Sequence, residues 1–175
     1  MTPLPAALGG TGLASWRLER DTHLSSWDQA QGAYLVGGRW SSAGRRVLYT
    51  SLDPATTILE VAVHKGFQGL DRVPHTLLEL GVDPAGVHIL GRSDIPDAHW
   101  LRPGTVSSNQ QQFGDTLLDR YPLLLVPSAV STHSWNLLIH VPKADGLFVL
   151  KYQEPFALDP RLSPGLPAGS LPTGG

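Results

Sequence analysis

The chain has 175 residues, which is enough for one domain with a hydrophobic core and short for two. Its net charge of −2 gives no basic field for non-specific binding of nucleic acid, and the absence of cysteine excludes disulfides and thiolate metal sites. Charged residues make up only 16% of the chain, below the roughly 25% usual for soluble domains. We interpret this low charge as surface that a partner or another copy covers.

The sequence predicts neither a membrane segment nor a secretion signal. The N-terminus lacks a basic region followed by an apolar core, and no apolar run approaches the ~20 residues that span a bilayer. We therefore expect a soluble cytoplasmic protein. Residues 1–12, rich in Gly and Pro, are expected to form a flexible arm, and residues 163–175, poor in bulky side chains, a disordered tail.

The first part of the domain predicts two strands followed by a helix. Side chains alternate with period two before Asp53, and Asp53 followed by Pro54 is a favourable helix start. Gly66 is a good residue to end that helix. The predicted elements are a strand over 13–18, a short helix or loop over 21–31 with Trp27 packed inward, a turn at 41–44, a strand over 46–51 and a helix over 54–65.

The predicted helix carries one acidic residue that interests us, Glu60. Helical spacing places an apolar face along one side of the helix and Glu60 beside that face. Packing of the face would then hold the carboxylate at the rim of a cleft, although exposed helical glutamates are also common. The residues predicted to form the face are Ala55, Ile58, Leu59, Ala62 and Val63.

The second part of the domain predicts more strands and one further helix. In chain order we expect a core strand within 70–82, a strand over 87–90, a surface loop over 92–104, a helix over 107–120, a buried strand over 123–128, and a strand pair, 135–141 with 146–152, joined by a turn at 142–145. Gly114 weakens the helix by about 1 kcal/mol relative to alanine. Without repeats or regular βαβ alternation, the pattern favours a single α+β domain with small mixed or antiparallel sheets and two or three helices.

Common catalytic and ligand-binding motifs are absent. The seven histidines show neither HxxxH nor HExxH spacing, so we expect no metal site. Gly37 and Gly38 belong to neither a GxGxxG nor a GxxxxGK[ST] loop, and no GxSxG motif occurs. Ser128 follows a buried strand, but a nucleophilic serine needs a positioned base, which the sequence does not name. Contact with a substrate hydroxyl is the simpler role for it.

Five residues remain as candidates for a site, and together they suit one kind of chemistry. Two arginines can bind a pyrophosphate bidentately, and a tyrosine ring can stack on a planar group such as nicotinamide. A carboxylate beside C1 of a ribose can stabilise an oxocarbenium-like transition state. The set therefore suits cleavage of an N-glycosidic bond, while an unspecific domain with surface charges stays the alternative. The candidates are Arg17, Arg39, Tyr49, Glu60 and Ser128.

At these residues the chain resembles the RES-domain family, toxins of type II toxin–antitoxin pairs. The resemblance runs from 16 to 162. Its most specific segments are 37–40 (GGRW), 47–51 (VLYTS), 59–64 (LEVAVH) and 126–130 (VPSAV), with weaker support from 112–115 and Asn136. It implies a catalytic domain over 13–162 whose fold is similar to that of ADP-ribosyltransferase toxins.

The resemblance also implies an activity and partners. NAD would be the substrate rather than a bound cofactor, cleaved by hydrolysis or by phosphorolysis with inorganic phosphate as co-substrate. A helix-turn-helix antitoxin encoded nearby would block the NAD cleft of a toxin homodimer within a larger complex, leaving DNA contact to the antitoxin. The implied roles are phosphate binding and catalysis for Arg17 and Arg39, stacking near nicotinamide for Tyr49, catalysis for Glu60, and substrate contact for Ser128 and Asn136.

The chain departs from the family pattern at three positions. Val36 stands where the family usually has an aromatic residue, and whether the nearby Tyr34 takes that role stays open. Ser41 and His140 each stand in place of an asparagine. These departures bear on the nicotinamide side of the site, and with it on the choice between phosphorolysis, hydrolysis and transfer. Two alternatives stay open: an ADP-ribosyltransferase that modifies a host protein, and a catalytically inactive module that binds a partner.

Overall fold

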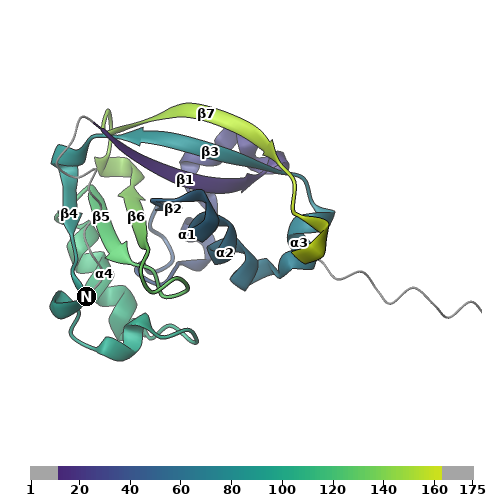
Figure 1. The fold of residues 1–175 in the computed structure, drawn as a ribbon. Helices are drawn as coiled ribbons and strands as arrows, with labels where there is room; N and C mark the ends of the chain where they lie inside the picture. Colours follow the sequence, from purple (N-terminus) through teal and green to yellow (C-terminus); the bar gives the residue numbers. More distant parts are fainter. Residues whose placement is uncertain (1–11, 163–175) are drawn as a thin grey trace, which may run out of the picture.

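The computed structural model describes residues 12–162, which form one sheet with helices packed around it (Figure 1). Seven strands lie in the order β4-β5-β6-β2-β1-β3-β7. Their bounds are Leu13–Arg20 (β1), Val47–Ser51 (β2), His75–Val82 (β3), Val87–Ile89 (β4), Leu123–Pro127 (β5), Trp135–His140 (β6) and Phe148–Phe156 (β7). The α-helices of this part of the chain are Gln31–Val36 (α1), Pro54–Lys65 (α2), Phe67–Arg72 (α3) and Ser108–Leu118 (α4). The arrangement confirms the predicted α+β class.

The sheet consists of two halves that meet at one residue pair. β1 pairs antiparallel with β3 along its whole length, and β3 pairs antiparallel with β7. On the other side β6 pairs antiparallel with both β2 and β5, and β4 lies parallel to β5. Between the halves, β1 and β2 are joined only at Trp16 opposite Ser51, and Figure 1 shows the strands of the two halves running in different directions.

Three clusters of buried side chains hold these elements together. The first joins the two halves of the sheet, with Leu48 and Leu137 from one half and Leu80 from the other. The second lies between α4 and the face of β5 and β6, and it includes Trp40. The third packs α2 and α3 against β1 and β3. Together they fix the loop that follows α1, and they fix α2, which carries Glu60.

Helix α2 begins and ends as the sequence predicts. The Asp53 carboxylate accepts hydrogen bonds from the Thr56 backbone N–H and hydroxyl, both at 2.7 Å. Such a cap typically contributes about 1 kcal/mol. At the other end Gly66 has a φ of 71°, and its N–H donates to the carbonyl of Ala62. A residue with a Cβ is strained at that φ, so glycine suits the end of this helix.

The predicted buried face of α2 is only partly correct, because Ala62 is buried and Ile58 packs against the third cluster. Ala55, Leu59 and Val63 are exposed, whereas Thr56 and Thr57 are buried. The Thr57 hydroxyl donates to the Trp16 carbonyl of β1, so this side of the helix packs on the sheet. Because α2 has apolar residues around much of its circumference, spacing alone does not select the buried side.

The predicted strand pair of 135–141 with 146–152 is also wrong. β6 pairs with β5 on one edge and β2 on the other, and Leu137, Leu138 and Ile139 have no exposed surface. Such a strand belongs in the middle of a sheet. β7 runs from Phe148 to Phe156, is mostly exposed and pairs with β3 instead. The turn between the strands exists, but it directs the chain into the other half of the sheet.

The remaining predictions concern smaller segments. Helices α1 and α3 are each only six residues long and were not predicted from the sequence. Trp27 is packed inward as predicted, with its ring edge-on to Phe148 at 6.2 Å. The predicted terminal arm and tail lie, apart from Gly12, outside the described residues. None of the helices within 12–162 has the length and apolar character needed to cross a membrane.

Candidate active site

The carboxylate of Glu60 is held by two side chains from the other half of the sheet. The Ser128 hydroxyl donates to Glu60 Oε1 at 2.8 Å, and the Asn136 side-chain amide donates to the same oxygen at 2.6 Å. Among the described residues, Glu60 Oε2 has no hydrogen-bond partner. The carboxylate, which is partly exposed, thus has one oxygen fixed by the protein and one available to a ligand.

Ser128 is placed by the turn that follows β5. Its Oγ accepts the backbone N–H groups of Val130 at 3.1 Å and Ser131 at 3.0 Å, and the side chain has no exposed surface. A hydroxyl has one hydrogen to donate and two lone pairs to accept with. All three are therefore in use, and the hydrogen points to Glu60. The predicted contact of Ser128 with substrate stays a prediction.

Arg17 lies on β1 with its guanidinium against β2. Its Nη1 donates to the Tyr49 carbonyl at 3.1 Å, and its Nε donates to the Glu19 carboxylate at 2.9 Å. The side chain retains 21% of its surface. The guanidinium is therefore oriented by two partners and still has N–H groups that a phosphate could bind.

The Tyr49 side chain supports the loop that carries Arg39. Its hydroxyl oxygen accepts the Trp40 N–H at 3.1 Å and lies 2.9 Å from Ser41 Oγ. The ring lies so close to Gly38 that a Cβ there would be 2.4 Å from the ring and hydroxyl atoms. Tyr49 thus packs against the backbone of the GGRW segment, which explains why this position must be glycine.

Arg39 extends toward the irregular stretch after β4. Its Nη1 donates to the carbonyls of Trp100 at 3.0 Å and Arg102 at 3.3 Å. A polar cavity of about 340 Å³ adjoins Trp100. The residues lining it are Asp97, His99, Trp100, Thr105, Ser107, Asn109 and Gln110.

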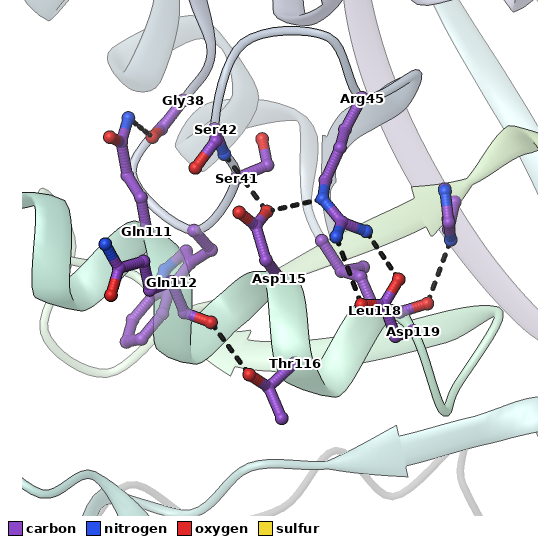
Figure 2. Close-up of polar contacts among 12 residues, drawn as sticks. Gly38, Ser41, Ser42, Arg45, Gln111, Gln112, Asp115, Thr116, Leu118 and Asp119 are labelled. Carbon is purple, nitrogen blue, oxygen red and sulfur yellow. Dashed lines mark hydrogen bonds and ion pairs between the residues drawn. The ribbon is translucent and has the colours of Figure 1, made fainter.

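Helix α4 also contacts the loop that carries Arg39 (Figure 2). Asp115 accepts the Ser42 backbone N–H at 3.1 Å and forms an ion pair with Arg45 at 2.9 Å. Gln111 donates to the Gly38 carbonyl at 2.9 Å. Gly114 lies directly against the Trp40 backbone. The position of Arg39 is therefore set by α4 and by Tyr49 together.

The structure brings some of the predicted residues into direct contact and others only near a common strand. Glu60, Ser128 and Asn136 form one hydrogen-bonded group, while Arg17 and Tyr49 meet at β2. Within residues 12–162 no hydrogen bond joins either arginine to Glu60. No group of three or more His, Cys, Asp or Glu side chains in this range is placed to hold a metal ion.

The three departures from the family pattern have different surroundings. Val36 is 80% exposed, and Tyr34 carries the Arg46 guanidinium over its ring at 4.5 Å. Ser41 is buried and contacts the Tyr49 hydroxyl, as described above. His140 Nδ1 lies 2.9 Å from the Leu118 carbonyl at the end of α4, and burial lowers the pKa of this histidine. Ser41 therefore has a structural contact at the site, and His140 has one with the end of α4.

Sequence reasoning missed Ser51, the last residue of β2. It is 2% exposed, and its hydroxyl donates to Asn136 Oδ1 at 2.8 Å. The available signal was strand alternation, because Ser51 lies two residues beyond Tyr49 and so on the same face of β2. Alternation does not say which residue of another strand lies opposite.

We expect the buried hydroxyl of Tyr49 to make stability depend on pH. Burial raises the pKa of Tyr49 to about 12 by desolvating the ionised form, although the hydrogen bonds from Ser41 and Trp40 lower it. The unfolded chain releases this proton near pH 10. The resulting stability is therefore complete below about pH 10 and is lost as the pH rises toward 12.

Between pH 9 and pH 11 the protein should lose about 1.4 kcal/mol more unfolding free energy than its Tyr49→Phe variant. Urea unfolding at both pH values measures the difference. Tyr34→Phe, which removes an exposed hydroxyl, serves as the control and should retain the dependence of the parent protein. Equal pH dependence in the parent and Tyr49→Phe would contradict the expectation.

Comparison with solved structures finds the same fold in a chain of a toxin–antitoxin complex. A chain of the M. tuberculosis MbcT–MbcA toxin–antitoxin complex matches with a TM-score of 0.70. The match covers 84% of this chain and 85% of that chain at 16% identity, so it shows a common fold.

The sequence comparisons establish the family. The RES domain model matches residues 14–159. A Prs ADP-ribosylating toxin of Sphingobium sp. (strain YBL2) is 31% identical over 156 residues, covering 84% of this chain and 94% of the relative. A Toxin Res of Pseudomonas putida (strain KT2440) is 31% identical over 152 residues, covering 84% and 97%. The chain belongs to the RES domain family and is a toxin of that family, which confirms the resemblance seen in the sequence.

Proposed function

We propose that this toxin consumes NAD by cleaving the bond between nicotinamide and ribose. The observation that supports this most is the state of Glu60, whose Oε1 receives two hydrogen bonds while Oε2 receives none from residues 12–162. A carboxylate fixed in this way needs no reorganisation to stabilise positive charge that develops on a ribose. The nicotinamide ring of NAD is cationic and becomes neutral when it leaves, so its departure needs no general acid.

The other candidate residues have roles that fit the same substrate. Arg17 and Arg39 come from different elements and can bind the two phosphates of NAD. The Tyr49 ring can stack on nicotinamide, while its hydroxyl stays bound to the GGRW loop. Three acceptors are consistent with this site: water, inorganic phosphate or a protein side chain.

Transfer of ADP-ribose to a protein is the second candidate. It is favoured by the Sphingobium relative, which is an ADP-ribosylating toxin. The first step is the same in both functions, because nicotinamide departs before the acceptor attacks. Glu60, Arg17 and Arg39 would keep their roles, and only the acceptor would differ.

An inactive binding module is a weaker explanation of the site. Two donors, the buried Ser128 and the partly buried Asn136 through its amide, converge on one carboxylate oxygen. Burying polar groups costs free energy unless they hydrogen-bond to one another. Even when they do, they add little stability beyond what apolar side chains in the same place would give. A role in chemistry accounts for them better.

The direct test is incubation of the purified protein with NAD, with and without inorganic phosphate. If water is the acceptor, we expect nicotinamide and ADP-ribose under both conditions. If phosphate is the acceptor, nicotinamide appears only when phosphate is present, together with the mass of phosphorylated ADP-ribose. If nicotinamide appears only when cell extract is added, together with a protein carrying a new ADP-ribosyl mass, the transferase is correct. Unchanged NAD under all three conditions would contradict the proposal.

We also propose that the toxin acts in the cytoplasm as a homodimer bound by a helix-turn-helix antitoxin. The support is the structural neighbour, which is a toxin–antitoxin complex, and the exposed side chains Leu59 and Val63, one turn apart on α2 beside Glu60. Light scattering of the toxin co-expressed with the product of its neighbouring gene measures the composition. A monomeric toxin that retains no second protein would contradict this part.

A further inference from the structure

Ser51 connects to Glu60 through a single intervening side chain. The Ser51 hydroxyl donates to Asn136 Oδ1 at 2.8 Å, and Asn136 Nδ2 donates to Glu60 Oε1 at 2.6 Å. Ser51 and Asn136 lie directly opposite each other in the ladder between β2 and β6. The connection therefore runs from the sheet to the helix that carries the carboxylate.

Ser51 and Glu60, on either side of Asn136, fix which end of the Asn136 amide donates and which accepts. An asparagine amide has a carbonyl end and an NH₂ end, and a half-turn exchanges them. With an ionised Glu60, only the NH₂ end can face the carboxylate favourably. The carbonyl end then faces Ser51, whose hydroxyl is able to donate. Each contact is satisfied in this orientation, and removal of the Ser51 hydroxyl leaves a carbonyl without that donor.

Ser128 completes the arrangement from another segment. Its hydrogen goes to the same Glu60 oxygen, because both of its lone pairs accept backbone N–H groups. Glu60 Oε1 is thus held by one donor from β6 and one from the turn after β5. Rotation of the carboxylate would break both bonds, so Oε2 keeps a constant direction.

We infer that Ser51 is a positioning residue that acts through Asn136 to orient the Glu60 carboxylate, with Oε2 directed to the ribose of the substrate. Ser128 acts on the same oxygen and orients Glu60 rather than contacting the substrate. This inference rests on the proposed function for the identity of the substrate. A simpler role for Ser51 is stabilisation of the β2–β6 pair, and the experiment must separate the two.

Ser51→Ala is expected to lower kcat for NAD cleavage about 10-fold, the scale of one hydrogen bond, with KM changed less than about 2-fold. Thr50→Val is the matched control. Thr50 is the preceding residue of β2, is also buried, and donates its hydroxyl to the Leu137 carbonyl, away from Glu60. It should lower thermal stability to a similar degree and keep kcat.

A double-mutant cycle tests whether Ser51 acts through Glu60. The residual rate of the Glu60→Ala variant is measured from the amount of product, identified by its mass, after long incubation. The double variant Ser51→Ala/Glu60→Ala should be slower than Glu60→Ala by less than about 2-fold. The inference is overturned if Ser51→Ala costs as much in that background as in the parent protein. An equal loss of kcat in Thr50→Val would overturn it too.

A second readout does not depend on activity. The Asn136 side-chain amide signals in nitrogen-15 NMR spectra should move in Ser51→Ala and in Glu60→Ala and stay in place in Thr50→Val. If the parent protein leaves NAD intact while these signals move as expected, the proposed function fails and the positioning of Glu60 by Ser51 stands. Signals that do not respond to Ser51→Ala overturn the inference whether or not NAD is consumed.

Discussion

Replacing Glu60 by glutamine is expected to lower kcat for NAD cleavage by at least ~100-fold and to leave the fold intact. The glutamine carbonyl can still accept the hydrogen bonds that Ser128 and Asn136 donate to Oε1. The substitution therefore keeps the orientation of the side chain and removes its charge. Only the transition state carries a developing positive charge on the ribose, so the loss falls on kcat rather than on KM.

Arg39→Ala provides the contrast. A phosphate contact is present in the ground state and the transition state alike, so its loss should raise KM and change kcat little. The lost contacts with the Trp100 and Arg102 carbonyls add to this effect by releasing the neighbouring stretch. Steady-state kinetics on both variants, with thermal melting to check folding, decide the matter. A folded Glu60→Gln protein that keeps most of its kcat would remove Glu60 from the mechanism.

Gly114→Ala is expected to have the largest effect on stability. A Cβ at this position would lie 2.1 Å from the Trp40 carbonyl oxygen. Alanine favours the helix by about 1 kcal/mol over glycine, whereas overpacking costs about 1–3 kcal/mol and at times more. The obstructing atoms are backbone, which cannot rotate away, so the clash exceeds the gain. Taking the upper end of that cost, we expect a net loss of about 2 kcal/mol, or ~4–8 °C in Tm.

Gly69→Ala is the matched control for this substitution. Gly69 also lies in a helix, and an added Cβ would meet only the Lys65 Cβ at 3.4 Å, which is ordinary contact. Its Tm should stay the same or rise. Gly114 lies against the loop that carries Arg39. The fraction of the Gly114→Ala variant that is folded in the assay should therefore also show a higher KM for NAD. Equal melting temperatures for the two variants would contradict the packing argument.

The consequence of Gly114 could not be derived from its sequence position. Helix propensity describes it as a weak point of α4, and that description is correct for an isolated helix. In the folded chain the missing side chain is what allows α4 to touch the Trp40 backbone. A residue that is unfavourable locally is favourable here because a distant segment occupies the space.

Several features were determined by the sequence alone, because they depend on neighbours within a few residues. The start of α2 at Asp53 and Pro54 and its end at Gly66 follow from capping chemistry and from the φ that glycine permits. The extents of β2 and β5 follow from alternation and apolar runs. The GGRW segment and the residues near Glu60 were also sufficient to identify the family.

The tertiary structure alone decided how these elements meet. The buried side of α2 depends on Trp16 of β1, and the partners of β6 are β2 and β5 rather than the strand that follows it. The bond from Ser128 to Glu60 joins positions 68 residues apart, and the bond from Ser51 to Asn136 joins positions 85 apart. Local patterns fix backbone conformation, whereas such contacts depend on which buried surfaces fit together, and a single sequence does not display that.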